Sequence, residues 1–268
     1  MKNKNNKTNK TILAALFILL ILFFAIRLAS INNITIDHQN YELVKHNYDF
    51  NNLKNNEQIK SYDDENYTSL FGIDLSYHQG DINWQELSNN QLDFIYLRVG
   101  YRGFTDGGLF LDDKFLEYVN ASNEYEIPVG YYFFDQAITV KEAVAEAKFV
   151  LEYEKDYPSS YPIVLDLEPI DNSRTSNLNN QERTDIALAF LQTISATGKE
   201  VMIYSSGPYL LDFFNYEQIA NYPVWLAHYT DIPNFPYQFK IWQYSETGTL
   251  SGISELVDLN IMFVEKES

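Results

Sequence analysis

The segment YPIVLDLEPI, residues 161–170, predicts a short strand that is covered on both faces and carries two acids near its end. Asp166 and Glu168 interrupt an otherwise apolar run two positions apart. Because alternate side chains of a strand share a face and each residue rises ~3.3 Å, the two acids are expected on one face, roughly 6 to 7 Å apart.

Two carboxylates at this spacing repel each other, and one of them commonly keeps its proton near neutral pH. An acid is then placed beside a base, as in the catalytic pairs of glycosidases. The alternative for Asp166 and Glu168 is structural, with one acid capping a following turn and the other pairing with Lys or Arg. The segment alone leaves both interpretations open.

Working outward, short apolar runs alternate with helical patterns from Phe71 onward, which is typical of βα units around a parallel sheet. Helix starts are indicated by capping patterns at residues 83–86, 139–142 and 179–182. Toward the C-terminus the linkers become too short for full helices. The expected fold is an α/β, irregular (β/α) TIM-like barrel with a strand-rich C-terminal half. Its eight strands are expected at residues 71–75, 94–100, 128–134, 162–168, 200–205, 223–229, 239–244 and 256–262.

Polar residues fall late in these runs, where the functional side chains of parallel barrels are found. Four of them are acids, and crowding four acids at one rim costs free energy unless they have a shared role. The residues concerned are Asp74, Arg98, Tyr132, Asp166, Glu168, Tyr204, Trp242 or Gln243, and Asp258.

Composition excludes several classes of site and partner. The 268 residues contain no Cys, so neither a disulfide framework nor a thiolate nucleophile is available. A net charge of −18 argues against a nucleic-acid partner. The four His residues lack metal-binding spacing, and TDGGLFLDDKF (105–115) lacks the alternating oxygen ligands of a calcium loop, so that Asp112 is interpreted as a cap. Neither a metal nor a cofactor is expected.

The N-terminus predicts a membrane segment followed by a linker. Residues 1–10 are basic, and Thr11 to Ile26 are continuously apolar, so residues 1–30 are interpreted as a signal anchor or transmembrane segment. A single-pass protein of the cell membrane is expected, with the domain at residues 69–268 outside the cytoplasm. The alternative is a secreted protein whose signal peptide is cleaved. Residues 31–68 are polar and without periodicity, which predicts an extracytoplasmic linker.

Seven motifs occur in an order that resembles the glycoside hydrolase family 25 lysozymes, the Chalaropsis-type N-acetylmuramidases. They are FGIDLSYHQGDINW, YLRVGYRGFTDGGLFLDDKF, IPVGYYFFDQA, PIVLDLEP, VMIYSS, VWLAHYTD and IWQYSETGTLSGISELVDLNIM, which together cover about residues 70 to 264. The resemblance implies cleavage of the β-1,4 bond between N-acetylmuramic acid and N-acetylglucosamine in peptidoglycan glycan strands, without a metal or cofactor. The sequence does not determine the oligomeric state, and a monomeric domain is expected.

The resemblance also implies roles for individual residues. Glu168 matches the family's general acid, Asp166 the acid two residues before it, and Asp74 and Asp258 two further aspartates of the site. We expect Asp166 to stay ionised and to stabilise the substrate's acetamido group or the oxocarbenium charge. Family members commonly have an acid near Tyr101, so this part of the substrate contact is expected to differ. The substrate-binding residues are expected to be Tyr132, Tyr204, Trp225, Trp242, Arg98 and Tyr101.

Two rival functions are compatible with parts of this pattern. A chitinase-like hydrolase or an N-acetylglucosaminidase could use the same acid pair, although the longer D-x-x-D-x-D-x-E motif is absent because Pro162 and Val164 occupy two of its positions. A non-catalytic cell-wall-binding module is the second rival, and the intact pair of Asp166 and Glu168 argues against it. The i, i+2 spacing of the pair does not separate a retaining from an inverting reaction.

Overall fold

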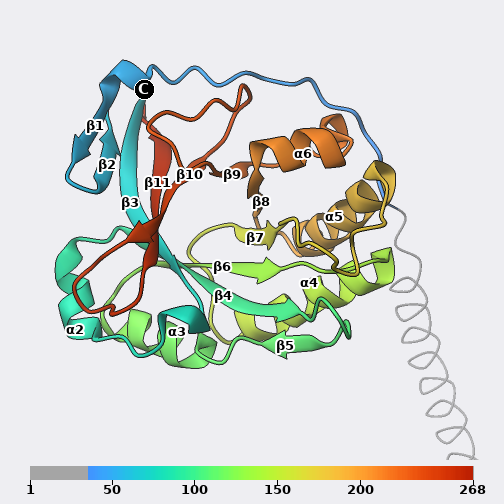
Figure 1. Ribbon diagram of the computed structural model, residues 1–268, viewed down its shortest axis with the longest axis horizontal. Helices are drawn as coiled ribbons and strands as arrows, with labels where there is room; N and C mark the ends of the chain where they lie inside the picture. The colour runs from blue at the N-terminus through green and yellow to red at the C-terminus, as the bar shows by residue number, and fades with distance from the viewer. Residues whose placement is uncertain (1–35, 268) are drawn as a thin grey trace, which may run out of the picture. The chain divides into compact units, whose positions relative to one another are not determined.

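Eight strands close into a barrel in the computed structural model, which describes residues 36–267 (Figure 1). All eight correspond to runs expected from the sequence, with ends that differ by a few residues. The strands are β3 (Tyr67–Leu75), β4 (Phe94–Arg102), β6 (Val129–Phe134), β7 (Ile163–Asp166), β8 (Val201–Ser206), β9 (Val224–Ala227), β10 (Ile241–Gly248) and β11 (Val257–Glu265).

The barrel is mixed because its last strand runs against its neighbours. From β3 through β4, β6, β7, β8 and β9 to β10, each adjacent pair is parallel. Strand β11 pairs antiparallel with both β10 and β3 and so closes the barrel. A short strand, β5 (Leu109–Leu111), extends the sheet beside β4 as an antiparallel hairpin. The expected irregular barrel is therefore confirmed.

In the described residues, α-helices follow the parallel strands from β3 to β8, but none follows β9 or β10. The α-helices are α2 (Trp84–Leu87), α3 (Phe115–Glu124), α4 (Val140–Glu154), α5 (Asn180–Ser195) and α6 (Gly207–Phe213), and the 3₁₀ turns are η1 (Phe50–Asn52), η2 (Tyr77–Gln79), η3 (Ser88–Asn90) and η4 (Tyr216–Gln218). The side chains of Asn83, Thr139 and Asn179 accept hydrogen bonds from backbone amides three residues later, as the capping patterns predict.

Large rings fill the barrel interior below the ends of the parallel strands. Tyr96 and Trp225 pack with ring centroids 4.7 Å apart, and both are almost fully buried. Gly130 makes room for this packing, because a Cβ atom there would lie 2.3 Å from the ring of Tyr96. The filled interior supports the carboxyl ends of the strands, so that side chains placed there have a rigid base.

Residues 38–66 pack along the barrel instead of forming the polar linker expected over residues 31–68. They include a hairpin of β1 (Leu53–Asn56) and β2 (Ile59–Tyr62). The ring of Tyr48 stacks on Phe263 at 4.1 Å, and its hydroxyl donates to the carbonyl of Phe239. The aromatic residues of this segment are irregularly spaced, so their burial left no periodic signal. Residues 31–35 lie outside the described part.

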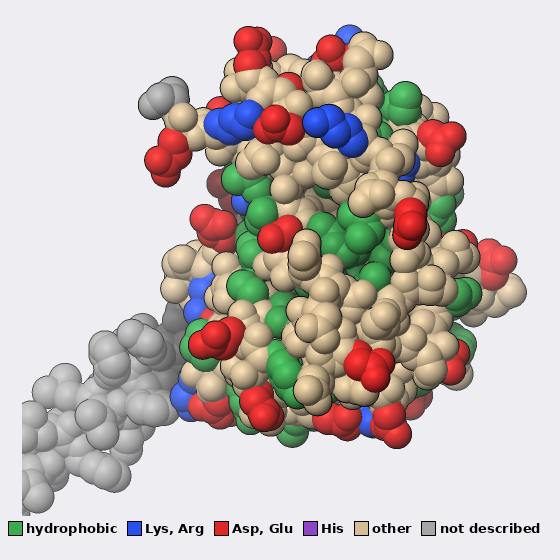
Figure 2. All heavy atoms as spheres, turned by 90° about the vertical axis from the view of Figure 1, so that its left-hand side faces the viewer, with side chains coloured by type: hydrophobic (Ala, Val, Ile, Leu, Met, Phe, Trp, Pro, Cys, Tyr) green, Lys and Arg blue, Asp and Glu red, His purple; other side chains and the backbone are tan. Residues whose placement is uncertain are grey.

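The surface of the described part is predominantly acidic, as the net charge implies. On the face drawn in Figure 2, acidic side chains are scattered widely and basic ones are fewer. The apolar segment that the sequence assigns to the membrane, within residues 1–30, lies outside the described residues. Among residues 36–267, no helix combines the length and hydropathy that crossing a membrane requires.

Candidate active site

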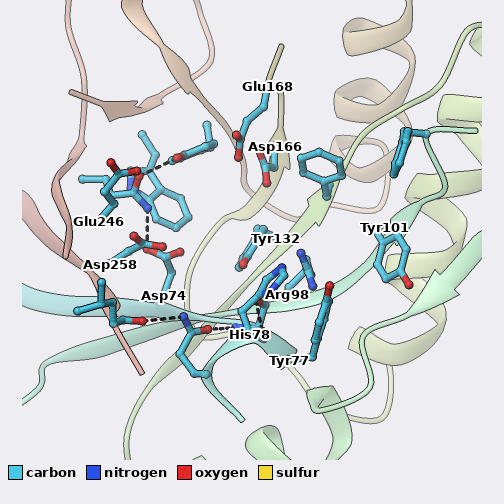
Figure 3. Close-up of a pocket in the computed structure, with 18 residues that line it drawn as sticks. Asp74, Tyr77, His78, Arg98, Tyr101, Tyr132, Asp166, Glu168, Glu246 and Asp258 are labelled. Atoms are coloured by element: carbon cyan, nitrogen blue, oxygen red, sulfur yellow. Dashed lines mark hydrogen bonds between the residues drawn. The ribbon is translucent and has the colours of Figure 1, made fainter. Parts of the chain in front are cut away.

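A cleft of about 680 Å³ opens at the carboxyl ends of the parallel strands (Figure 3). It contains all four predicted acids and five of the six predicted substrate-binding residues. The lining consists of Asp74, Ser76, Tyr77, His78, Gln79, Arg98, Tyr101, Phe104, Tyr132, Phe134, Asp166, Glu168, Tyr204, Trp225, Gln243, Glu246, Leu256 and Asp258.

Asp166 and Glu168 form the first acid pair of the cleft, at the end of β7 and just beyond it. Their side chains lie next to each other, with Asp166 almost fully buried and Glu168 partly exposed (Figure 3). Burial, followed by the charge of Glu168, raises the pKa of Asp166 well above its ordinary value, and burial also raises the pKa of Glu168. Both shifts favour retention of a proton by the pair, and because the two groups interact the shifts belong to the pair and not to either residue alone.

Asp74 and Asp258 form a second acid pair, which comes from β3 and β11. The Oδ2 atom of Asp74 accepts hydrogen bonds from Gln243 Nε2 at 2.9 Å and Asn260 Nδ2 at 2.8 Å. Burial, followed by the negative charge of Asp74, raises the pKa of Asp258 to about 9. This shift favours the protonated form of Asp258 at neutral pH. Burial also raises the pKa of Asp74, while the hydrogen bonds from the two amides oppose that rise by favouring its charged form.

Arg98 is held rigidly at one side of the cleft. Its Nε atom donates to Asp112 Oδ2 at 2.8 Å, and its Nη2 atom lies 2.8 Å from the same oxygen. The guanidinium lies over the rings of Tyr77 and Tyr101, at 4.9 and 5.3 Å from their centroids. Asp112 also accepts from the backbone amide of Lys114, but Lys114 and not Asp112 is the N-cap residue of α3, so the cap expected at Asp112 is not formed. Arg98 is thus a preorganised cation facing the acids.

Tyr132, Tyr204 and Trp225 form an aromatic part of the cleft wall. The rings of Tyr132 and Trp225 meet edge to face at 6.1 Å, and those of Tyr204 and Trp225 at 4.9 Å. The hydroxyl of Tyr204 donates to Gln243 Oε1 at 2.7 Å. Tyr101, nearer the rim, stacks on Phe110 at 5.4 Å. Aromatic faces and hydrogen-bonding groups in one cleft suit a sugar ligand.

Trp242 does not lie in the cleft, although the sequence interpretation placed it there. Neighbouring residues of a strand point to opposite faces, and on β10 it is Gln243 that faces the acids. Trp242 is fully buried on the other face, where its Nε1 atom donates to the carbonyl of His228 at 2.7 Å.

The cleft also contains residues to which the sequence interpretation assigned no role. Gln243, one of two options at its strand end, bonds to Asp74, while Glu246 and Phe104 come from the rim. His78 lines the cleft with its ring 4.0 Å from that of Tyr77. The sequence signal for Gln243 was its place late in an apolar run, and that for His78 was its place just after a strand end.

Metal binding has no support within residues 36–267. No group of three or more His, Cys, Asp or Glu side chains in that range is arranged to hold a metal ion. Among the cleft carboxyl groups, Asp74 accepts hydrogen bonds from two amides, and the charge of Arg98 acts on Asp166 and Glu168. The site can donate a proton from one buried acid while keeping another carboxylate charged nearby, as glycosidic bond cleavage requires.

A comparison with protein families places this arrangement in a known group. The model of "Glycosyl hydrolases family 25" matches residues 73–253, which include three of the four acids and most of the barrel. This chain belongs to glycosyl hydrolase family 25. The fourth acid, Asp258, lies just past the matched segment and is brought to the site by the β3–β11 pairing.

The relatives of this family 25 chain include lysozymes and autolysins. It is 30% identical to Lysozyme M1 of Streptomyces globisporus, over 70% of this chain and 66% of the lysozyme. It is 28% identical to the Escherichia coli protein YegX, over 72% of this chain and 69% of YegX.

The modular autolysin LytC of Streptococcus pneumoniae, solved with a synthetic peptidoglycan ligand, resembles this chain with a TM-score of 0.64 and 26% identity. The alignment covers 73% of this chain and 47% of that of LytC. The chain therefore spans about half the length of this solved relative.

Proposed function

We propose that this family 25 protein is an N-acetylmuramidase, which cleaves the β-1,4 bond between N-acetylmuramic acid and N-acetylglucosamine in peptidoglycan. The observation that carries the proposal is the convergence of two acid pairs, each with a raised pKa, in one sugar-sized cleft. The names of Lysozyme M1 and LytC, and the peptidoglycan ligand of LytC, support this choice of substrate.

Glu168 is the general acid in this proposal. It is the more exposed member of its pair, so it is better placed than Asp166 to reach a glycosidic oxygen. The proton shared by the pair passes from Glu168 to that oxygen as the bond from the oxygen to C1 breaks. Asp166 and Asp74 then stabilise the positive charge that develops on the sugar or its acetamido group.

The preferred second step is attack on C1 by the carbonyl oxygen of the substrate's own acetamido group. Water then attacks C1 as the bond between C1 and the acetamido oxygen breaks, and a proton of the water returns to the acid pair, which restores the starting state with net retention. Asp166 or Asp74 would orient the acetamido N–H during this step. Proton NMR of the first product tests this version, because an initial α-anomer would contradict retention.

Identification of the new reducing end tests the proposed substrate bond. The full-length protein is incubated with purified peptidoglycan, and the released ends are reduced with borohydride and identified. Reduced muramic acid is the expected product. Reduced glucosamine would indicate the N-acetylglucosaminidase alternative, and the absence of any release would indicate a non-catalytic wall-binding module.

We further propose that the apolar segment within residues 1–30 anchors the protein in the cell membrane, with the cleft outside the cytoplasm. The support is the sequence pattern alone, a basic stretch followed by a long apolar run. Membrane fractionation combined with protease digestion of intact cells tests it. Recovery of a full-length protein in the soluble cytoplasmic fraction would contradict the proposal.

A further inference from the structure

A second groove, of about 480 Å³, lies against the β1–β2 hairpin. The hairpin precedes the segment that matches the family model, so this groove is built partly from residues outside the shared domain. Most of its lining side chains can form hydrogen bonds. They are Asn55, Glu57, Gln58, Lys60, Tyr229, Thr230, Asp231, Tyr244 and Ser245.

The groove adjoins the catalytic cleft at Tyr229 and along β10. The hydroxyl of Tyr229 donates to Gln243 Oε1 at 2.8 Å, and Gln243 lines the cleft. The ring of Tyr229 is 46% exposed and lines the groove. Ser245 of the groove is followed directly by Glu246 of the cleft. A linear polymer that leaves the cleft on this side would therefore enter the groove.

The hairpin wall is fixed to the barrel. Gln58 and Thr249 form two hydrogen bonds, in which the Gln58 side chain donates to the Thr249 carbonyl and accepts from the Thr249 amide. The backbone amide of Lys60 donates to the hydroxyl of Tyr244 at 3.2 Å. A groove with walls held in this way needs little ordering when a ligand binds.

Lys60 is the basic side chain of this groove and forms no ion pair with a described residue, although the lining also contains Glu57 and Asp231 and the charge of Asp231 acts on Lys60 from beyond ion-pair distance. Its residue is only 9% exposed, yet no carboxylate of residues 36–267 lies within ion-pair distance of its ammonium. Its Nζ atom donates to Asn55 Oδ1 at 3.0 Å and to the Asp231 carbonyl at 3.4 Å. Because an ammonium has three donors, one remains for a ligand.

A poorly solvated cation without a carboxylate partner favours an anionic ligand group. The ammonium also lies over the rings of Trp242 and Tyr244, at 5.4 and 5.5 Å from their centroids, which holds its position.

We infer that the groove binds the peptidoglycan strand beyond the cleaved linkage and that Lys60 binds a carboxylate of that strand. The inference rests on the proposed function. Peptidoglycan has carboxylates on its stem peptides and on the lactyl groups of those muramic acids that carry no peptide, whereas chitin has none. The exposed face of Tyr229 offers a stacking surface for a sugar ring, and Lys60 adds selectivity for the anionic polymer.

The test measures binding of full-length protein to insoluble peptidoglycan and to chitin, in a Glu168→Gln background that limits turnover. Lys60→Met keeps the apolar stem of the side chain and removes the charge, and it is expected to weaken peptidoglycan binding by about tenfold. Lys60→Arg is expected to keep most of the binding. The matched control is Lys54→Met, which removes an exposed lysine of the same hairpin outside the groove and should not change binding.

Chitin binding should be equal in all of these variants. The inference would be overturned if Lys60→Met did not weaken peptidoglycan binding, or if Lys54→Met weakened it equally. It would also be overturned if Lys60→Met weakened chitin binding to the same extent. Peptidoglycan stripped of its peptides exposes the lactyl carboxylates, so an effect of Lys60→Met that persists there shows that Lys60 binds the lactyl group, and loss of the effect shows that the stem peptide supplies the carboxylate. If Lys60→Met does not fold, Lys60→Gln is measured in its place. Failure of the proposed function is visible separately, as the absence of reduced muramic acid after the unchanged full-length protein is incubated with peptidoglycan.

Discussion

Asp74 and Asp258 are directly opposed residues of the antiparallel strands β3 and β11. Side chains in such positions share a face, with Cβ atoms about 4.5 to 5.5 Å apart, and two like charges there are destabilising. The structure relieves the repulsion in two ways. Gln243 and Asn260 donate hydrogen bonds to Asp74, and Asp258 holds a proton, with its pKa raised to about 9.

This pair makes the stability of the protein depend on pH. The folded-state pKa of Asp258 is about 9, against an ordinary value of 3.8, so the folded state binds the proton more tightly than the unfolded state does. Below its ordinary pKa, Asp258 makes its full contribution to the free energy of unfolding. This contribution decreases to zero as the pH rises toward 9. Asp258→Asn removes this dependence. We expect the variant to gain stability relative to the wild type between about pH 5 and about pH 8.

Urea unfolding at the two pH values measures this difference. Asp113→Asn, which alters an exposed aspartate, is the control and should show no such gain. A stability difference between Asp258→Asn and the wild type that stays constant or shrinks with rising pH would mean that Asp258 is ionised in the folded protein.

Glu168→Gln tests the assignment of the general acid. The amide has nearly the same shape but cannot donate the transferable proton, so we expect kcat to fall by about 10² to 10⁴-fold. The measurement is the release of reducing ends from peptidoglycan, together with a thermal melt to show that the fold is kept. Glu246→Gln changes an exposed glutamate of the same cleft and is expected to lower kcat far less. Similar losses in both variants would contradict the role of Glu168.

The barrel and its acids could be predicted from the sequence because both depend on local patterns. Buried strands require apolar runs, and an acid placed late in such a run reaches the rim. The hairpin at residues 53–62 left no such pattern, because isolated rings such as Tyr48 and Tyr62 hold its segment against the barrel.

In β10, the alternation of side chains along a strand is not enough to predict which residues face the cleft. A run of apolar and aromatic residues does not reveal which alternate set faces inward, so Trp242 and Gln243 could not be separated by sequence alone. Register shifts between Gln243 and Ser245, and again before Gly248, then interrupt the alternation. The position of Glu246 in the cleft depends on this irregularity, which is a property of strand pairing that local sequence does not encode.

Arg98 is expected to control the pH range of activity. Burial raises the pKa values of Asp166 and Glu168, and the positive charge of Arg98 counteracts part of that rise. Activity requires the shared proton and is lost as pH rises through the pKa of the pair. Arg98→Met should therefore move the alkaline limb of the kcat/KM profile to higher pH, whereas Arg98→Lys should move it less. A limb that stays in place or moves to lower pH would show that Arg98 does not influence the acid pair.

Asp112 is expected to be the main support of Arg98 and a large contributor to stability. Its side chain is 1% exposed, that of Arg98 is 11% exposed, and it also accepts from the backbone amides of Tyr77 and Lys114. Asp112→Ala leaves a largely buried guanidinium and two amides without their acceptor, so we expect the free energy of unfolding to fall by about 3 to 5 kcal/mol. Urea denaturation measures the change.

The adjacent Asp113 provides the matched control, because it is exposed and precedes the same helix. Asp113→Ala should change the free energy of unfolding by no more than about 0.5 kcal/mol. Asp112→Asn separates charge from shape, since the amide keeps one acceptor for Arg98 but loses the ion pair, and an intermediate loss is expected. If Asp112→Ala were as mild as Asp113→Ala, Arg98 would have to find another partner in the folded protein, and the rigid cation at the cleft wall would not depend on this ion pair.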